Sequence, residues 1–358
     1  MSRIAAVSAV VCNYNGESYL TDCLESVLAQ GAGAGLDEVI VVDDASSDGS
    51  VALVRARFPG VKVIQLARNS GPCAARNAGM RAARNRWVLA VDNDAVLAPD
   101  VLAKLRAALE ARPEACLAQV RSVLFDEPTR VHYDGGAFHY LGLIALRNSF
   151  VPLAEAEGAG VVAARALVAI CALLDRDAVL SLGGYDEELF YLAEDLDLSL
   201  RLALAGETLV SVEDALVRHR GGTAGLSFRG GGYPRRRVYL HARNRRRILV
   251  KCYRWRTLLL ILPAFALYEL VWLAFALRQG ELGALVAGRI AFLRGLASTL
   301  RARRALQARR RVSDRALLVG GPLVLSPSLV AGGAARTAAR WLDRVLRAWW
   351  ACVRPLSG

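Results

Sequence analysis

Short apolar runs alternate with amphipathic stretches along the first hundred residues of the chain. Four of these runs are rich in valine, isoleucine and leucine, as strands covered on both faces are. They span residues 5–13, 38–43, 61–66 and 87–91. Helical periodicity lies between them, and Leu20, Leu24 and Val27 fall on one helix face. Because strands that alternate with helices pack as a covered parallel sheet, the pattern predicts an α/β fold with a Rossmann-like, mostly parallel central sheet flanked by helices.

The second half of the chain has a different pattern. Residues 194–205 have a helical pattern that ends at Gly206, which suits a helix C-cap. A basic stretch at residues 235–247 then precedes two apolar segments, residues 257–277 and 282–300. The first segment is long enough to cross a bilayer core at about 1.5 Å per residue. This pattern predicts an all-α, membrane-associated C-terminal region.

Three parts are therefore expected along the chain. Residues 1–250 form the α/β domain, residues 251–312 the apolar and basic membrane-associated helices, and residues 313–358 an amphipathic C-terminal tail. Pro263 and Glu269 interrupt the apolar segment and argue against a simple span. A helical hairpin, a pair of helices in the membrane plane and a buried helical subdomain all fit this pattern.

Composition agrees with a membrane surface as partner. The chain has 46 lysines and arginines against 33 acidic residues, a net charge of +13, so anionic surfaces should attract it. Nucleic acid and acidic lipid both qualify. The excess charge coincides with the apolar runs after about residue 235, which favours lipid, and no nucleic-acid-binding module is recognisable. The seven scattered cysteines lack a C-x-x-C pair, and the N-terminus lacks a signal-peptide pattern, so we expect a cytoplasmic setting.

Polar residues follow the predicted strands at the points where they end. Parallel strands bring their carboxyl ends to one edge of a sheet, where open α/β sheets bind ligands. Loops are polar in any protein, so ordinary solvated loops are the alternative. Acidic groups from several strand ends favour a ligand site. The residues concerned are Asn13, Asn15, Asp43, Asp44, Asp92, Asn93 and Asp94.

Asp92 and Asp94 are two carboxylates separated by one residue, directly after a predicted strand. Mg²⁺ and Mn²⁺ take oxygen ligands and often bind through one or two carboxylates, with substrate phosphates as further ligands. The pair therefore predicts a site for one of these cations. The alternative is an Asx-type turn that caps the helix beginning near Pro99.

A second acidic cluster, Glu194 and Asp195, lies at the start of the predicted helix 194–205. Carboxylates in a first helical turn are stabilised by the helix dipole whatever the function, which is the structural alternative. The functional interpretation is a general base that removes a proton from an acceptor hydroxyl, a role worth roughly 100- to 10,000-fold in rate.

These motifs together resemble the inverting, family 2 glycosyltransferases with the GT-A fold, particularly the rhamnosyltransferase-like branch. The resemblance covers about the first 250 residues in the family's order and spacing. The matching stretches are residues 10–15, 41–50, 69–71, 75–79, 92–94, 184–187 and 194–197, together with Phe190 and His219.

The resemblance implies roles for individual residues. Asp44, beside Asp43, would contact the nucleobase, and Arg76 would lie near the nucleotide. Asp94 would be the principal ligand of Mn²⁺ or Mg²⁺, and Asp92 would face the ribose or the metal. Asp195 would be the general base, next to Glu194. The nucleotide sugar is also expected to bind to three asparagines, Asn13, Asn15 and Asn93. His219 either approaches the metal or is a plain loop histidine.

The resemblance also implies the reaction, a direct displacement at the anomeric carbon with inversion, assisted by a metal acting as Lewis acid. Transfer of a single sugar is expected, because the processive members' Q-x-x-R-W motif has only a near match without glutamine at residues 337–341. We expect a nucleotide-sugar donor and a lipid-linked saccharide acceptor at the cytoplasmic face of the cell membrane, in cell-envelope polysaccharide biosynthesis. A catalytically inactive membrane scaffold with the same fold is the alternative.

Overall fold

The computed structural model describes residues 3–168, 170–221, 233–323 and 332–358, and the chain divides into two compact units. The first unit comprises Met1–Gly135, Arg147–Leu202 and Glu207–Gly221. The second comprises Gly136–Leu146, Ala203–Gly206 and Gly222–Gly358. Within the predicted tail 313–358, residues 324–331 lie outside the described residues.

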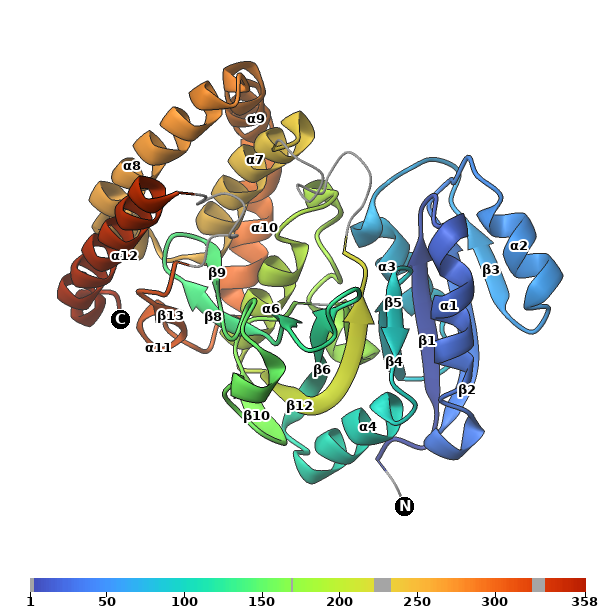
Figure 1. Cartoon of the computed structure of the whole chain (residues 1–358). Helices are drawn as coiled ribbons and strands as arrows, with labels where there is room; N and C mark the ends of the chain where they lie inside the picture. Colours follow the sequence, from blue (N-terminus) through green and yellow to red (C-terminus); the bar gives the residue numbers. More distant parts are fainter. Residues whose placement is uncertain (1–2, 169, 222–232, 324–331) are drawn as a thin grey trace. The chain divides into compact units, whose positions relative to one another are not determined.

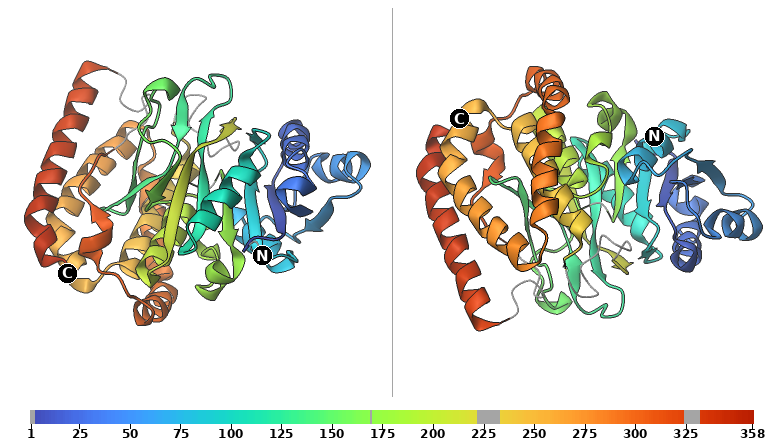
Figure 2. Two further views of the ribbon diagram at one scale, coloured as in Figure 1. Left: turned by 90° about the horizontal axis from the view of Figure 1, so that it is seen from below. Right: turned by 90° about the horizontal axis from the view of Figure 1, so that it is seen from above.

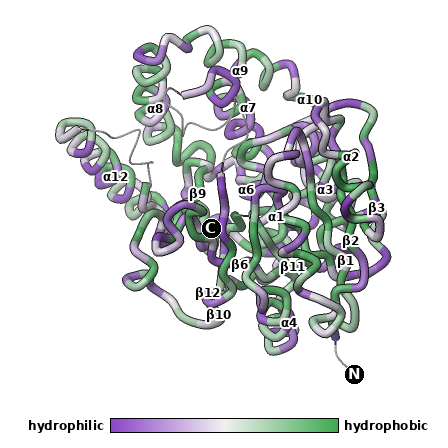
Figure 3. Tube along the Cα trace, turned by 45° about the vertical axis from the view of Figure 1, so that its right-hand side comes forward, coloured by the Kyte–Doolittle hydropathy of each residue, from purple (hydrophilic) through white to green (hydrophobic). Residues whose placement is uncertain are grey.

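The described strands of the first unit form one ten-stranded sheet (Figure 1). Its main path has the order β10-β12-β6-β11-β4-β1-β2-β3, with β5 paired to β12 and β7 paired to β6. Hydrophobic residues recur along these strands (Figure 3). The strands are β1 (Val7–Asn13), β2 (Leu36–Asp43), β3 (Lys62–Gln65), β4 (Trp87–Asp92), β5 (Ala95–Leu97), β6 (Ala115–Leu124), β7 (Val131–Tyr133), β10 (Val161–Ala164), β11 (Cys171–Asp175) and β12 (Thr208–His219).

The predicted parallel sheet is confirmed for the four N-terminal strands. β1 pairs in parallel with β2 and β4, and β2 pairs in parallel with β3. β11 runs antiparallel to both β4 and β6, so the sheet as a whole is mixed. β6 and β7 are also antiparallel. The segment 125–130 that joins them is shorter than the crossover of about a dozen residues that parallel neighbours need.

Helices cover both faces of the sheet (Figure 2). The apolar faces of α1 and α4 pack in one core with alternate residues of β1, such as Val7, Ala9 and Val11. The intervening Val10 points to the other face of the sheet and packs against Gly79 of α3. A Cβ added to Gly79 would lie 2.2 Å from Cγ1 of Val10, so only glycine allows this close approach. The helices of this unit are α1 (Glu17–Leu28), α2 (Ser50–Arg57), α3 (Pro72–Ala82), α4 (Val101–Ala111) and α5 (Arg176–Ser181), and α6 (Glu194–Ala205) extends three residues beyond it.

The second unit is mainly helical, as predicted for the C-terminal region. It also holds a small sheet of order β13-β8-β9 among the described residues. Its elements are β8 (Gly136–His139), β9 (Leu143–Leu146), α7 (Arg235–Cys252), α8 (Trp255–Arg278), α9 (Leu282–Arg294), α10 (Leu296–Ala308), α11 (Asp314–Leu317), β13 (Leu318–Val319) and α12 (Gly333–Val353).

One described helix, α8, is long and apolar enough to cross a membrane, and most of it is not buried. The second apolar segment is broken into α9 and α10, which meet at Gly295 with a bend of 59°. Inside α8, Glu269 is neutralised by ion pairs with Arg245, Arg246 and Arg289. Part of the basic stretch 235–247 therefore forms ion pairs within this unit.

Candidate active site

Three parallel strands end together at the carboxyl edge of the sheet. The register pairs Asn13 with Asp43 and Cys12 with Asp92, so the ends of β1, β2 and β4 are aligned. Asn13 Nδ2 donates to Asp43 Oδ1 at 2.9 Å, and Asn93 Nδ2 donates to Asn13 Oδ1 at 2.8 Å. These bonds bring together residues from three strand ends, as the sequence predicted.

Gly16 allows these asparagines to approach each other closely. A Cβ at this position would lie 2.1 Å from Asn93 Nδ2 and 2.4 Å from Asn13 Oδ1. We expect Gly16→Ala to lower the free energy of unfolding by about 1–3 kcal/mol, as overpacking of a well-packed site does. Urea unfolding measures the change. Gly33→Ala is the control, since nothing lies within 4 Å of its added Cβ, and equal stability of both variants would contradict the prediction.

The carboxylates of Asp43 and Asp44 shape the loops beside this edge. Both residues are buried. Asp43 Oδ2 accepts from the Ser46 N–H at 3.0 Å, and the carboxylate of Asp44 accepts from the amides of Ser70 and Gly71, each at 2.7 Å. Burial raises the pKa of Asp44 above its ordinary value, although the two amide bonds lower it. The predicted nucleobase contact would thus involve carboxylates that already hold the loops in place.

Asn15 ties the same loop to the end of β1. Its Oδ1 accepts from the Ser47 N–H at 2.8 Å, and its own N–H donates to Ser46 Oγ at 2.9 Å. Asn15 adopts a positive φ of 49°, which asparagine tolerates better than most residues. The structure therefore gives Asn15 a loop-shaping role, and its predicted contact with a nucleotide sugar stays a prediction.

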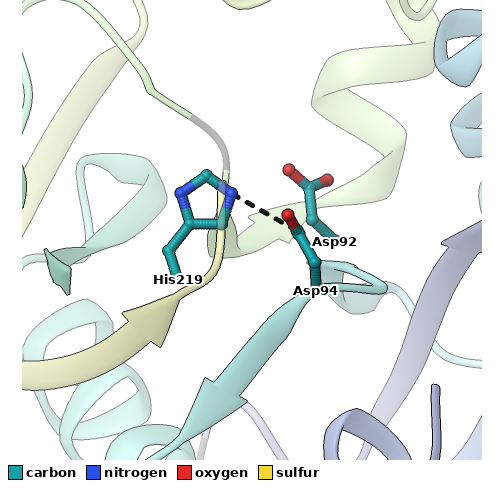
Figure 4. A group of neighbouring side chains, drawn as sticks. All are labelled: Asp92, Asp94 and His219. Atoms are coloured by element: carbon teal, nitrogen blue, oxygen red, sulfur yellow. Dashed lines mark ion pairs between the residues drawn. The ribbon is translucent and has the colours of Figure 1, made fainter. Parts of the chain in front are cut away.

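Asp92, Asp94 and His219 form a three-residue cluster at this edge (Figure 4). Each offers one ligand atom, and these atoms all lie within 4.8 Å of one another. The antiparallel register pairs His219 of β12 with Ala95 of β5, which places the histidine beside Asp94. His219 Nε2 lies 3.3 Å from Asp94 Oδ1, and the Gly221 N–H donates to Asp94 Oδ2 at 3.0 Å.

This donor set fits a divalent cation. Two carboxylates and one imidazole suit Mn²⁺, whereas Mg²⁺ prefers oxygen ligands alone. The alternative was that Asp92 and Asp94 form a turn that caps the next helix, α4. The contacts differ from this. Asp100 precedes α4 and makes no side-chain cap bond, and Asp94 bonds to the backbone of Gly221.

Arg76 of α3 links this cluster to the start of α6. The buried guanidinium donates to Asp92 Oδ1 at 2.6 Å and to Glu194 Oε1 at 3.4 Å, and it lies 5.2 Å from the ring centroid of Tyr185. Burial raises the pKa of Asp92, as does the charge of Asp94, and these effects outweigh the lowering by Arg76 and His219. A cation would relieve the repulsion between Asp92 and Asp94.

An unusual backbone brings Glu194 and Asp195 to this site. Phe190, Leu192 and Ala193 all have positive φ angles, of 65°, 73° and 69°. Such strained conformations concentrate at functional sites. Glu194 is buried against Arg76, whereas Asp195 is half-buried in the first turn of α6.

Asp197, the third acidic residue of this helix, has a structural role. It accepts from Arg201 Nε at 2.8 Å, and Arg201 also donates to the carbonyl oxygens of Leu182 and Gly184. The pair therefore holds the loop before α6. Of the three acidic residues in the first turn, Asp195 is therefore the one that is not fully buried.

No role for His132 follows from the sequence, and Asn77 lies in the matching stretch 75–79 without any indication of what this residue contacts. His132 Nδ1 lies 2.9 Å from His219 Nδ1. Asn77 of α3 bonds to the backbone of Tyr185 in both directions, through its Nδ2 and its Oδ1. Both contacts join residues about 90 to 110 positions apart, so no local pattern reveals them.

Comparison with known proteins supports a transferase. Residues 8–180 match the family described as "Glycosyl transferase family 2". The chain is also similar to the succinoglycan biosynthesis protein ExoO of Rhizobium meliloti (strain 1021). The two are 43% identical over 76 residues, and these residues make up 21% of each chain. The aligned segment thus spans about a fifth of that protein.

Solved structures share the fold. A structure of GalNAc-T7 with UDP, GalNAc and Mn²⁺ has a TM-score of 0.58 at 18% identity, over 76% of this chain and 52% of that one. S. aureus TarS has a TM-score of 0.50 at 19% identity, over 96% of this chain and 55% of that one. The chain thus spans about half the length of each, and the likeness establishes the fold alone.

Proposed function

Because residues 8–180 match glycosyltransferase family 2, we propose that the chain is an inverting, divalent-cation-dependent enzyme that transfers a single sugar from a nucleotide sugar to an acceptor hydroxyl. The observation that carries this proposal is the cluster of Asp92, Asp94 and His219, joined through Arg76 to the helix that begins with Glu194 and Asp195. It supplies a cation site and a candidate base at one edge of the sheet.

The donor would bind at the ends of β1, β2 and β4. Asp92, Asp94 and His219 would hold Mn²⁺ or Mg²⁺, and the structure of GalNAc-T7, which contains UDP and Mn²⁺, supports this choice. A bound divalent cation supplies Lewis acidity at the diphosphate leaving group. The loops held by Asp43 and Asp44 would enclose the nucleoside.

Asp195 would act on the acceptor. Asp195 is a half-buried residue in the first turn of α6, and the helix fixes the position of its carboxylate. It would remove the hydroxyl proton as the oxygen attacks the anomeric carbon, in one displacement that inverts configuration. Arg76 would keep Asp92 and Glu194 in place throughout, because it bonds to both.

A lipid-linked saccharide in cell-envelope glycan synthesis is our proposed acceptor. The relative in succinoglycan biosynthesis supports a polysaccharide pathway. α8 supports membrane association, since apolar side chains such as Leu259 and Leu270 are 67% and 63% exposed. The cytoplasmic face is our proposal from the sequence. Membrane attachment would bring the enzyme and a lipid-linked acceptor to the same surface. The rhamnosyltransferase-like branch rests on the sequence motifs alone.

Membrane attachment can be tested on the full chain. We expect Leu259→Gln/Leu270→Gln to weaken binding to anionic vesicles about tenfold or more, because each leucine would lose roughly 1.5–3 kcal/mol of burial in the lipid. Vesicle co-sedimentation measures the loss. The matched control is Leu28→Gln/Leu356→Gln, which alters leucines of 41% and 49% exposure elsewhere. Equal binding by both double variants would refute a role for α8.

The transferase activity is tested with a panel of nucleotide sugars and saccharide acceptors, scored by release of nucleoside diphosphate. We expect release from one donor, dependent on added Mn²⁺ or Mg²⁺ and abolished by EDTA. Nuclear magnetic resonance of the product would show inverted anomeric configuration. Release that is unaffected by EDTA, or retained configuration, would contradict the proposal.

A further inference from the structure

His219 uses its two ring nitrogens in two different directions. Its Nε2 lies 3.3 Å from Asp94 Oδ1, within the cluster that would hold the cation. Its Nδ1 lies 2.9 Å from Nδ1 of His132, and the two ring planes are inclined by 28° with their centroids 4.9 Å apart. A hydrogen bond between two imidazole nitrogens holds one proton, so the bond couples the tautomers of the two rings.

Two arrangements of neutral rings satisfy this bond. If His132 donates, His219 carries its proton on Nε2, donates it toward Asp94 and offers no lone pair to a cation. If His219 donates from Nδ1, its Nε2 has a free lone pair beside Asp92 and Asp94. Only the second arrangement lets His219 ligate a metal ion, because a ligating nitrogen cannot carry a proton.

We infer that His132 is a positioning residue that accepts the Nδ1–H of His219 and so directs the Nε2 lone pair of His219 to the cation. Metal-bound histidines usually donate their other N–H to a fixed acceptor, which sets the tautomer and orients the ring. The inference rests on the proposed cation site and names the residue that completes it.

The fold holds His132 rigidly in this position. The residue lies in β7, where Val131 pairs with Val123 of β6, while Leu124 of β6 pairs with His219 of β12. β7 and β12 therefore both pair with the end of β6, and this register brings His132 and His219 close together. His132 is 3% exposed, and its ring packs 3.8 Å from that of Tyr133, centroid to centroid. Burial limits the water that could replace it as an acceptor.

The test compares two substitutions at this position. His132→Leu fills a similar volume but removes the acceptor, whereas His132→Asn keeps a carbonyl oxygen near the place of Nδ1. Mn²⁺ alone is titrated into the full chain, and free Mn²⁺ is counted by electron paramagnetic resonance. We expect the leucine variant to bind Mn²⁺ about 10- to 100-fold more weakly. The asparagine variant should recover most of this loss.

Equal Mn²⁺ affinity of wild type and His132→Leu would overturn the inference, as would an asparagine variant as weak as the leucine one. If wild type itself binds no Mn²⁺, or binds it independently of Asp94, the proposed cation site fails instead. The two failures are therefore distinguishable.

A second measurement needs no substitution at His132. The chain has four histidines, so long-range proton–nitrogen correlation spectra of the wild type, labelled with nitrogen-15 histidine, can be assigned. With Zn²⁺ as a diamagnetic probe, we expect His219 to carry its proton on Nδ1 and His132 on Nε2. The opposite pair of tautomers would overturn the inference even if the variants fold poorly.

Discussion

Asp94→Ala is expected to lower kcat/KM for the nucleotide sugar at least about a thousandfold and to remove stimulation by Mn²⁺. Charge stabilisation by a metal ion at a leaving group is worth several kcal/mol, and each ~1.4 kcal/mol is a factor of ten in rate. Asp94 lies beside His219 in the cluster with Asp92, so its loss removes a central ligand. Initial rates of nucleoside diphosphate release across a Mn²⁺ titration measure the effect.

The matched control for this variant is Asp214→Ala. Asp214 lies in β12, the strand that also carries His219, and its exposed carboxylate faces Lys104 at 3.7 Å. We expect near-wild-type turnover from it. If Asp94→Ala retained Mn²⁺-stimulated turnover like that of the control, Asp94 would not hold the cation.

Asp195→Asn is expected to lower kcat about 100- to 10,000-fold while leaving the affinity for Mn²⁺ and for the donor nearly unchanged. Asparagine has the same shape as aspartate but cannot accept the acceptor's proton. Asp195 lies outside the cluster of cation ligands, so the two functions should separate. Steady-state kinetics with varied donor, together with a Mn²⁺ binding titration, measures both quantities.

Asp177→Asn is the control for a carboxylate at the same place in a helix. Asp177 is the second residue of α5, as Asp195 is of α6, and its exposed carboxylate pairs with Arg176 at 3.0 Å. Its substitution should leave kcat unchanged. A loss of Mn²⁺ affinity in Asp195→Asn as large as its loss of kcat would assign Asp195 to the cation site rather than to proton removal.

Local patterns in the sequence predicted the elements that build most of the site. The helix expected at residues 194–205 is α6 with the same bounds, and β1, β2 and β4 end close to the positions where polar residues interrupt their apolar runs. Strand alternation and helix caps depend on residues a few positions apart, so a single sequence contains them.

Partners that are distant along the chain could not be predicted in this way. The long strand β12 contacts β5, β6 and β10, and its pairing alone brings His219 to Asp94. His132 reaches His219 through the register of β12 with β6 and that of β6 with β7. The apolar runs of the middle segment do not encode which strand lies beside which, and this is also why the mixed character of the sheet was not foreseen.

The most direct test of the account is a crystal structure of the full chain grown with Mn²⁺ and a nucleoside diphosphate, with anomalous scattering recorded at the manganese edge. The account predicts a manganese peak within coordination distance of Asp94 and His219, beside Asp92, with the diphosphate on its open side. A well-occupied manganese peak elsewhere, or a diphosphate bound with none at this cluster, would contradict it.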